Sequence, residues 1–180
     1  MHLLINAIAF KIGWVSSVVG AAQEMPWLGP AAVIVAIAIH LSRAGKPATE
    51  LTLIVVCATL GALFDSTLVA LGWVEYPSGV FSAMLAPYWI ITMWMLFATT
   101  LNVSLRWLKN RKVLAAAIGL VSGPGSYLAG NQIGAIAFVD QSAALTALAI
   151  GWAILLPLLM HVSDELDGIA TLPARQRALR

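Results

Sequence analysis

The chain has 180 residues, of which 61% are hydrophobic and only 10% are charged, and its mean hydropathy is +0.91. Soluble domains carry about 25% charged residues, so this composition excludes a soluble monomer and indicates one polytopic membrane domain. The formal net charge of +2 supplies no large basic field for nucleic acid, and we expect no nucleic-acid partner. The single cysteine, Cys57, excludes an intramolecular disulfide.

Six apolar segments are candidates for crossing a bilayer, which takes about 20 residues in a helix. They span residues 2–22, 25–42, 51–73, 83–105, 113–130 and 142–161. The predicted fold is therefore an all-α bundle of six transmembrane helices, with residues 1–168 as one domain and residues 169–180 as a short basic tail. The stretch SGPGS at 122–126 interrupts the fifth segment, so we expect a kink at Gly123-Pro124-Gly125.

Lysines and arginines are sorted between alternate connections of this six-span arrangement. Nine follow spans two, four and six, namely Arg43, Lys46, Arg106, Lys109, Arg111, Lys112, Arg175, Arg177 and Arg180. The opposite connections hold Glu24, Glu75 and Asp140 but no basic residue. Because positive residues stay in the cytoplasm, both termini are predicted to be cytoplasmic. A cleaved signal peptide ending near VVGAAQ is the less favoured alternative, since no basic segment precedes the apolar run and Lys11 interrupts it.

Two charged residues, Lys11 and Asp65, lie inside predicted spans, where each charge costs about 2.5–3.5 kcal/mol on insertion scales. Asp65 shares a helical stripe with the small residues Ala58, Gly61 and Gly72, so we expect it to face other helices. At 1.5 Å per residue, Lys11 lies roughly 13 Å and Asp65 roughly 21 Å from the cytoplasmic ends of their spans. A Lys11–Asp65 ion pair is feasible; alternatively, Lys11 snorkels to the cytoplasm and hydroxyls or water hold Asp65.

A candidate catalytic site is predicted where spans three and four meet the outer surface. Asp65, as a desolvated carboxyl, could give or take a proton. Tyr88 could orient it or bind substrate, and Glu75, nearer to water, could relay protons. Trp89 follows directly after Tyr88 in the sequence and would form an apolar wall of the same pocket.

A metal or cofactor site is not expected. The three histidines, His2, His40 and His161, map to the cytoplasmic ends of spans, and His161 shares a helical face with Glu165. No dense ligand motif such as HExxH accompanies them, so we interpret them as interfacial histidines. The sequence also contains no GxGxxG fingerprint, Walker lysine loop or GxSxG elbow.

Three stretches, LLINAIAFKIGW, GALFDSTLVALGWVEYPSG and LAPYWIITMWMLFATTLNVSLRWL, resemble a bacterial inner-membrane family catalogued as domain of unknown function 2878. The resemblance covers about residues 3–170, and the matching signature residues are Asp65, Tyr76, Pro77, Pro87, Tyr88, Trp89 and Asn102. No activity is assigned to that family, but its genes often lie near genes for fatty-acid modification, which implies a part in membrane-lipid remodelling. No residue role can be carried over from the family; we list Tyr76 and Asn102 with Trp89 as candidate substrate-binding residues. The resemblance also implies membrane lipids, and other membrane or lipid-modifying proteins, as partners.

Three functions are compatible with these patterns. The first is an enzyme, or an accessory of an enzyme, that modifies a membrane lipid at Asp65 in a bacterial inner membrane. The second is a small transporter or channel subunit with Asp65 and Lys11 on an ion or proton path. The third is a structural or scaffolding subunit in which Asp65 only fixes the helix register. Lipid modification is the working hypothesis.

Overall fold

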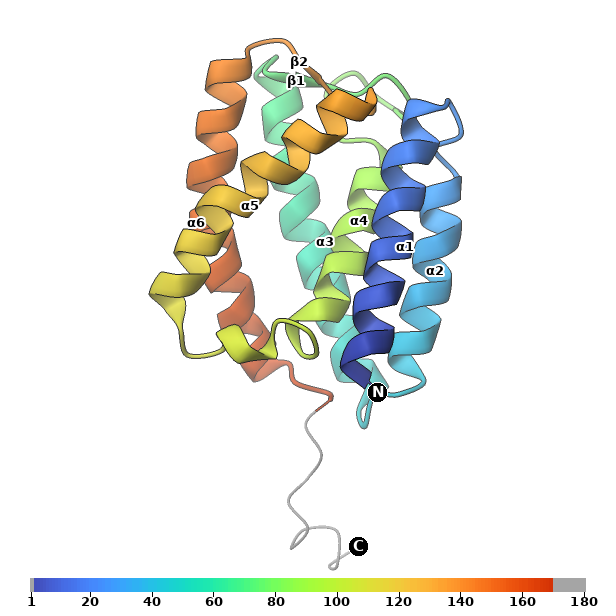
Figure 1. Cartoon of the computed structure of the whole chain (residues 1–180), viewed down its shortest axis with the longest axis vertical. Coiled ribbons are helices and arrows are strands. Elements are labelled where there is room, and N and C mark those ends of the chain that lie inside the picture. The colour runs from blue at the N-terminus through green and yellow to red at the C-terminus, as the bar shows by residue number, and fades with distance from the viewer. Residues whose placement is uncertain (1, 170–180) are drawn as a thin grey trace, which may run out of the picture.

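Six helices form the protein (Figure 1), whose structure is a computed structural model that describes residues 2–169. Four helices are long and apolar enough to cross a membrane: α1 (His2–Ala22), α3 (Pro47–Ala70), α5 (Lys112–Ile133) and α6 (Gln141–Glu165). Two apolar helices are shorter, with 14 residues each: α2 (Leu28–Leu41) and α4 (Tyr88–Leu101). The predicted all-α fold with six helices is therefore confirmed, and four of the six helices are long and apolar enough to cross a membrane.

Three minor elements accompany the helices. A short 3-10 helix, η1 (Arg106–Leu108), lies between α4 and α5. The strands β1 (Val74–Glu75) and β2 (Ala137–Phe138) pair antiparallel, with Val74 opposite Phe138 and Glu75 opposite Ala137. The sequence did not indicate this ribbon, which joins the segment after α3 to the segment before α6.

Local signals in the sequence set several helix ends. Pro47 begins α3, where its missing N–H removes no helical hydrogen bond. The Asp140 carboxylate accepts a 2.9 Å hydrogen bond from the Ala143 backbone N–H and caps α6. Gly134 ends α5 with φ of +92°, a left-handed conformation that favours glycine. α5 runs unbroken through Pro124, so the helix is not interrupted there, and the kink stays a prediction.

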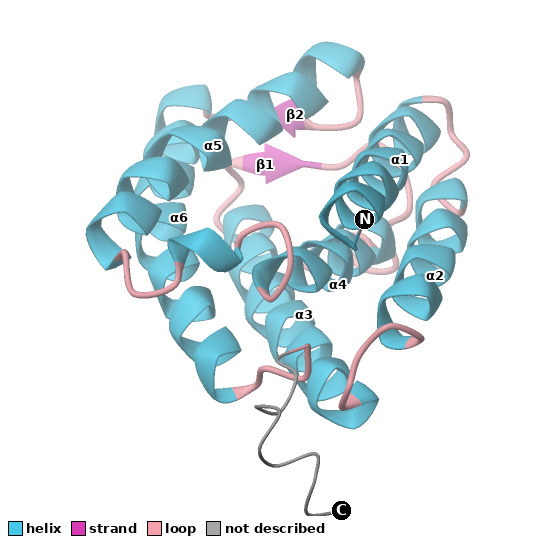
Figure 2. Cartoon of the chain, turned by 60° about the horizontal axis from the view of Figure 1, so that its bottom comes forward, coloured by secondary structure: helices cyan, strands magenta, loops and turns pink. Residues whose placement is uncertain are grey.

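The helices lie side by side in three pairs. α1 and α2 form one flank, α5 and α6 form the other, and α3 and α4 lie between them (Figure 2). Small residues bring the helices close: a Cβ at Gly119 of α5 would lie 2.2 Å from the carbonyl oxygen of Trp152 in α6. The outward faces are apolar, with Leu63, Val121 and Ile154 each more than 60% exposed. Such a surface suits contact with lipid chains.

The two ends of the bundle differ in charge. The α2–α3 connection, η1 and the end of α6 meet at the end where α1 begins (Figure 1), which we call the basic end. It carries six described basic residues, five in the connections and one at the start of α5: Arg43, Lys46, Arg106, Lys109, Arg111 and Lys112. The ribbon of β1 and β2 marks the opposite, strand end. Arg175, Arg177 and Arg180 of the predicted tail lie outside the described residues.

Candidate ligand-binding site

Asp65 lies in α3 with none of its surface exposed, which confirms that it faces protein. Three neutral donors surround its carboxylate. The hydroxyls of Tyr76 and Tyr127 donate to Oδ1 at 3.1 and 2.6 Å, and the indole Nε1 of Trp94 donates to Oδ2 at 2.6 Å. Tyr127 comes from α5, Trp94 from α4 and Tyr76 from the loop after β1. These bonds replace the water that a buried carboxylate loses, and they join four parts of the chain.

Gly61 makes this arrangement possible. It lies one helical turn before Asp65, and a Cβ there would be 2.0 Å from Cγ of Trp94. The Trp94 ring therefore packs directly on the α3 backbone. On its other side it stacks on Trp152, with ring centroids 4.8 Å apart, and it meets Phe97 edge-on at 6.1 Å. Gly61 therefore leaves the space that the Trp94 ring needs for its indole N–H to reach the Asp65 carboxylate.

Tyr76 is a firmly protonated donor outside the membrane helices. Burial, together with the nearby charge of Asp65, raises the pKa of its phenol well above the ordinary value. Its ring meets the ring of Trp89 edge-on, with centroids 5.7 Å apart. The Trp89 indole N–H in turn donates to the Ser78 carbonyl at 3.1 Å. The structure therefore brings together Asp65, Tyr76 and Trp89 of the residues proposed from sequence.

Other predicted site residues lie apart from Asp65. The Tyr88 ring packs against Phe81, with centroids 5.2 Å apart, and among residues 2–169 the three partners of Asp65 do not include it. Glu75 is exposed in β1 at the strand end. Asn102 is buried at the basic end of α4. The predicted Asp65–Tyr88–Glu75 set therefore does not form a cluster of bonded groups.

Lys11 does not pair with Asp65. Its ammonium lies 5.3 Å from the centroid of the Trp14 ring, and none of the ion pairs within residues 2–169 includes it. The physical reason is that the donors from Tyr76, Trp94 and Tyr127 already occupy both oxygens of Asp65. A cation–π contact returns about 0.5–2 kcal/mol, less than the roughly 2.5–3.5 kcal/mol of placing lysine mid-membrane.

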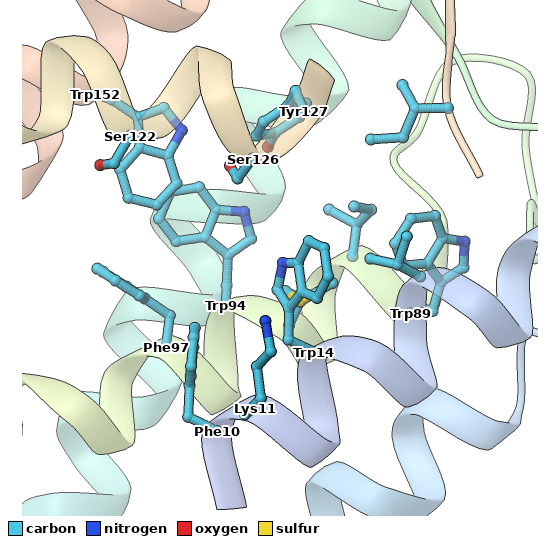
Figure 3. Close-up of a pocket in the computed structure, with 14 residues that line it drawn as sticks. Phe10, Lys11, Trp14, Trp89, Trp94, Phe97, Ser122, Ser126, Tyr127 and Trp152 are labelled. Carbon is cyan, nitrogen blue, oxygen red and sulfur yellow. The ribbon is translucent and has the colours of Figure 1, made fainter. Parts of the chain in front are cut away.

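A cavity of about 330 Å³ lies between α1, α4 and α5 and reaches α6 (Figure 3). Its volume is at the lower end of the range of ligand pockets, about 300–1,000 Å³. Its walls are mostly aromatic and aliphatic. The lining residues are Phe10, Lys11, Trp14, Val18, Trp89, Ile90, Met93, Trp94, Phe97, Ser122, Ser126, Tyr127, Ile136 and Trp152. Lys11 is the one charged residue in this set, and Figure 3 shows its side chain pointing into the cavity.

The cavity opens on the flank of the bundle. Two of its lining residues, Lys11 and Ser122, are exposed. Each lies near the middle of its helix, α1 and α5 respectively. An entrance at this height would face the acyl chains of a surrounding bilayer rather than water. Asp65 does not line the cavity, but two of its hydrogen-bond donors, Trp94 and Tyr127, form part of the wall.

A second polar cluster closes the basic end. Glu50 in the first turn of α3 has no exposed surface. Its carboxylate is 2.8 Å from His40 Nε2 and accepts hydrogen bonds from Asn102 Nδ2 at 2.8 Å and from the Gly168 backbone N–H at 2.7 Å. The cluster connects α2, α3, α4 and the segment after α6. Asn102, a candidate substrate ligand by sequence, therefore has a bonding partner here and does not line the cavity.

Sequence reasoning missed Glu50 and misplaced His40. The predicted third span began at residue 51, so Glu50 fell in a connection, while α3 begins four residues earlier at Pro47. His40 was expected at an interface but is buried. No group of three or more His, Cys, Asp or Glu side chains within residues 2–169 is arranged to hold a metal ion.

Comparisons with known proteins give one match. The model of a family described as "Protein of unknown function (DUF2878)" matches residues 3–158 of the chain. No curated protein and no solved structure gives a significant match. The family description assigns no reaction or ligand, so the function has to be argued from the geometry of the cavity.

Proposed function

Since the chain belongs to the DUF2878 family, which has no described function, we propose from its geometry that it binds an apolar, lipid-derived ligand and serves membrane-lipid modification. The accessory form of this role, in which the protein holds the ligand, fits the site better than catalysis by Asp65. The reason is that the Asp65 carboxylate lies behind Trp94 and Tyr127 and has three donors of its own. In this role Asp65 fixes the positions of the Trp94 and Tyr127 side chains in the cavity wall.

One observation carries the proposal: an aromatic cavity that opens sideways at mid-height of apolar helices. A ligand that is dissolved in water would have to cross lipid to enter there, whereas a lipid chain is already beside the opening. Because lipid tails are as apolar as the lining, a chain can enter without loss of solvation, and close contacts with the aromatic walls attract it. The transporter hypothesis has less support among the described residues, because an ion path needs several polar or charged groups and Lys11 is the sole charged group on the cavity wall.

The proposed setting is a six-span arrangement in a bacterial inner membrane, with both termini and the basic end in the cytoplasm. The short helices α2 and α4 span about 21 Å each at 1.5 Å per residue, so the bilayer would thin beside them or their flanking loops would enter it. Cysteine labelling tests the orientation in a Cys57→Ala background. An impermeant maleimide should label Val139→Cys, at the strand end, in intact spheroplasts. It should label Ser42→Cys, at the basic end, only after lysis; the reverse pattern would contradict the proposal.

Ligand binding is tested by the lipids that co-purify with the protein. We expect mass spectrometry of the detergent-purified protein to find a lipid species enriched over the bulk membrane extract. Ser126→Phe places a ring in the cavity and should reduce that enrichment several-fold. Thr59→Phe is the matched control, because Ser126 and Thr59 both donate to a carbonyl of their own helix, but Thr59 is exposed on α3. Equal enrichment in the two variants, or none in the wild type, would overturn the proposal.

A further inference from the structure

We propose that the ligand of the cavity carries an anionic group, a carboxylate or a phosphate, that pairs with Lys11; this inference rests on the proposed function. Lys11 is in the middle of α1, and its side chain points into the cavity rather than along the helix to the basic end (Figure 3). All eight acidic side chains of the protein lie within residues 2–169, and none of them makes an ion pair with Lys11 there.

The contacts of Lys11 leave most of its bonding capacity unused. An ammonium group has three N–H donors and no acceptor. The Trp14 ring attracts the charge from one side but accepts no conventional hydrogen bond. A carboxylate or phosphate oxygen would accept these donors and neutralise the charge in a region where water cannot. An uncharged ligand would leave the Lys11 ammonium without a counter-charge.

The rest of the lining restricts where the charge of the ligand can lie. Ser126 donates to the Gly123 carbonyl at 2.8 Å, and Tyr127 donates to Asp65, so both hydroxyl protons are already in use. The other neutral donors of the lining are the Ser122 hydroxyl and the indole N–H groups of Trp14 and Trp152, the last of which is buried without an acceptor. They can bond neutral oxygens of the ligand, but they carry no charge to balance an anion. The anionic group therefore belongs at Lys11, and the apolar chain belongs between Trp14, Trp89 and Met93.

Quenching of tryptophan fluorescence by brominated chains provides the test, because four tryptophans line the cavity: Trp14, Trp89, Trp94 and Trp152. The full-length protein in detergent is titrated with an octadecanoic acid brominated at mid-chain, with the matching alcohol and with the matching lysophosphatidic acid. The titrations are run at about pH 9, where the carboxyl group of the fatty acid is ionised. We expect the acid or the phosphate to bind roughly 10-fold or more tightly than the alcohol. The tighter of the two identifies the source of the anion.

Two variants test whether the preference for an anionic ligand depends on the charge of Lys11. Lys11→Met should bring the acid, phosphate and alcohol within about 2-fold of each other while the alcohol binds as in the wild type. Lys11→Arg keeps the charge and should keep the preference, which also excludes misfolding as the cause. Equal binding of all three chains by the wild type would overturn the inference and leave the proposed function standing. Absence of saturable quenching by any chain would overturn the proposed function itself.

Discussion

Replacing Asp65 by leucine tests whether this acid organises the bundle. Leucine is also branched at Cγ, with two methyl groups in place of the two oxygens, and it accepts no hydrogen bond from Tyr76, Trp94 or Tyr127. The variant would therefore leave three buried donors without their acceptor. Asp65→Asn retains one oxygen for Trp94, and its amide can donate to a tyrosine hydroxyl, so it should cost less than half as much as leucine.

The expected cost follows from the number of donors. An unsatisfied buried polar group costs about 1–3 kcal/mol, which gives roughly 3–9 kcal/mol for three groups. Hydrogen bonds between membrane helices are weaker, about 0.6 kcal/mol on average, and the tyrosine hydroxyls of Tyr76 and Tyr127 can rotate to other acceptors. We therefore expect Asp65→Leu to lower the free energy of unfolding by about 2–5 kcal/mol. At about 2–4 °C per kcal/mol for a chain of this size, Tm falls by about 4–20 °C.

The assay is thermal unfolding of the detergent-purified protein, followed by fluorescence-detected size exclusion. Glu75→Gln is the control, because it removes the carboxylate of an exposed residue in β1 and should change Tm by no more than about 2 °C. If Asp65→Leu melts together with the wild type and the control, the three hydrogen bonds do not stabilise the fold and the reasoning is refuted.

Two further predictions use the same assay. Gly61→Ala should lower Tm by several degrees and alter the near-UV circular dichroism, because its Cβ would lie 2.0 Å from the Trp94 ring. Gly125→Ala is the control: its Cβ meets no atom within 4 Å, so Tm should stay unchanged or rise. An unaltered spectrum for Gly61→Ala would show that Trp94 packs elsewhere. Glu50→Ala leaves three buried groups without their hydrogen-bond partner and should lower Tm by at least about 4 °C. Glu165→Ala, at an exposed position, should not lower it. Equal Tm values for the two variants would contradict the cluster at the basic end.

Hydropathy and small residues were enough to predict the helices and the orientation of Asp65. The six predicted spans match the six helices to within several residues, because apolar length is a property of the local sequence. The stripe of Ala58, Gly61, Asp65 and Gly72 indicated a protein-facing side. The first three residues are buried in α3, but Gly72 is exposed in the turn after α3 ends, so the stripe is shorter than predicted. What Gly61 accommodates, the ring of Trp94, depends on how α4 packs and was not predicted.

Two of the three partners of Asp65 could not be predicted because they lie far away in the sequence, whereas Tyr76, 11 residues away, was among the candidate site residues. Tyr127 is 62 residues from Asp65 and Trp94 is 29 residues away. Reasoning from sequence chose Tyr88 instead, since it begins the neighbouring span, but in the structure it turns to Phe81. The cavity was missed for the same reason, because its wall combines residues of four helices, α1, α4, α5 and α6, that share no sequence motif.

The central claim, that the cavity accepts a lipid chain, is tested most directly by photocrosslinking. A fatty acid with a diazirine at mid-chain is irradiated with the purified protein, and the modified peptides are located by mass spectrometry. We predict adducts on α1 around Trp14, on α4 around Met93 and on α5 around Ser126, and their loss in Ser126→Phe but not in Thr59→Phe. Adducts spread evenly over the exposed apolar faces, including that of Leu63 in α3, and unaffected by Ser126→Phe would contradict it.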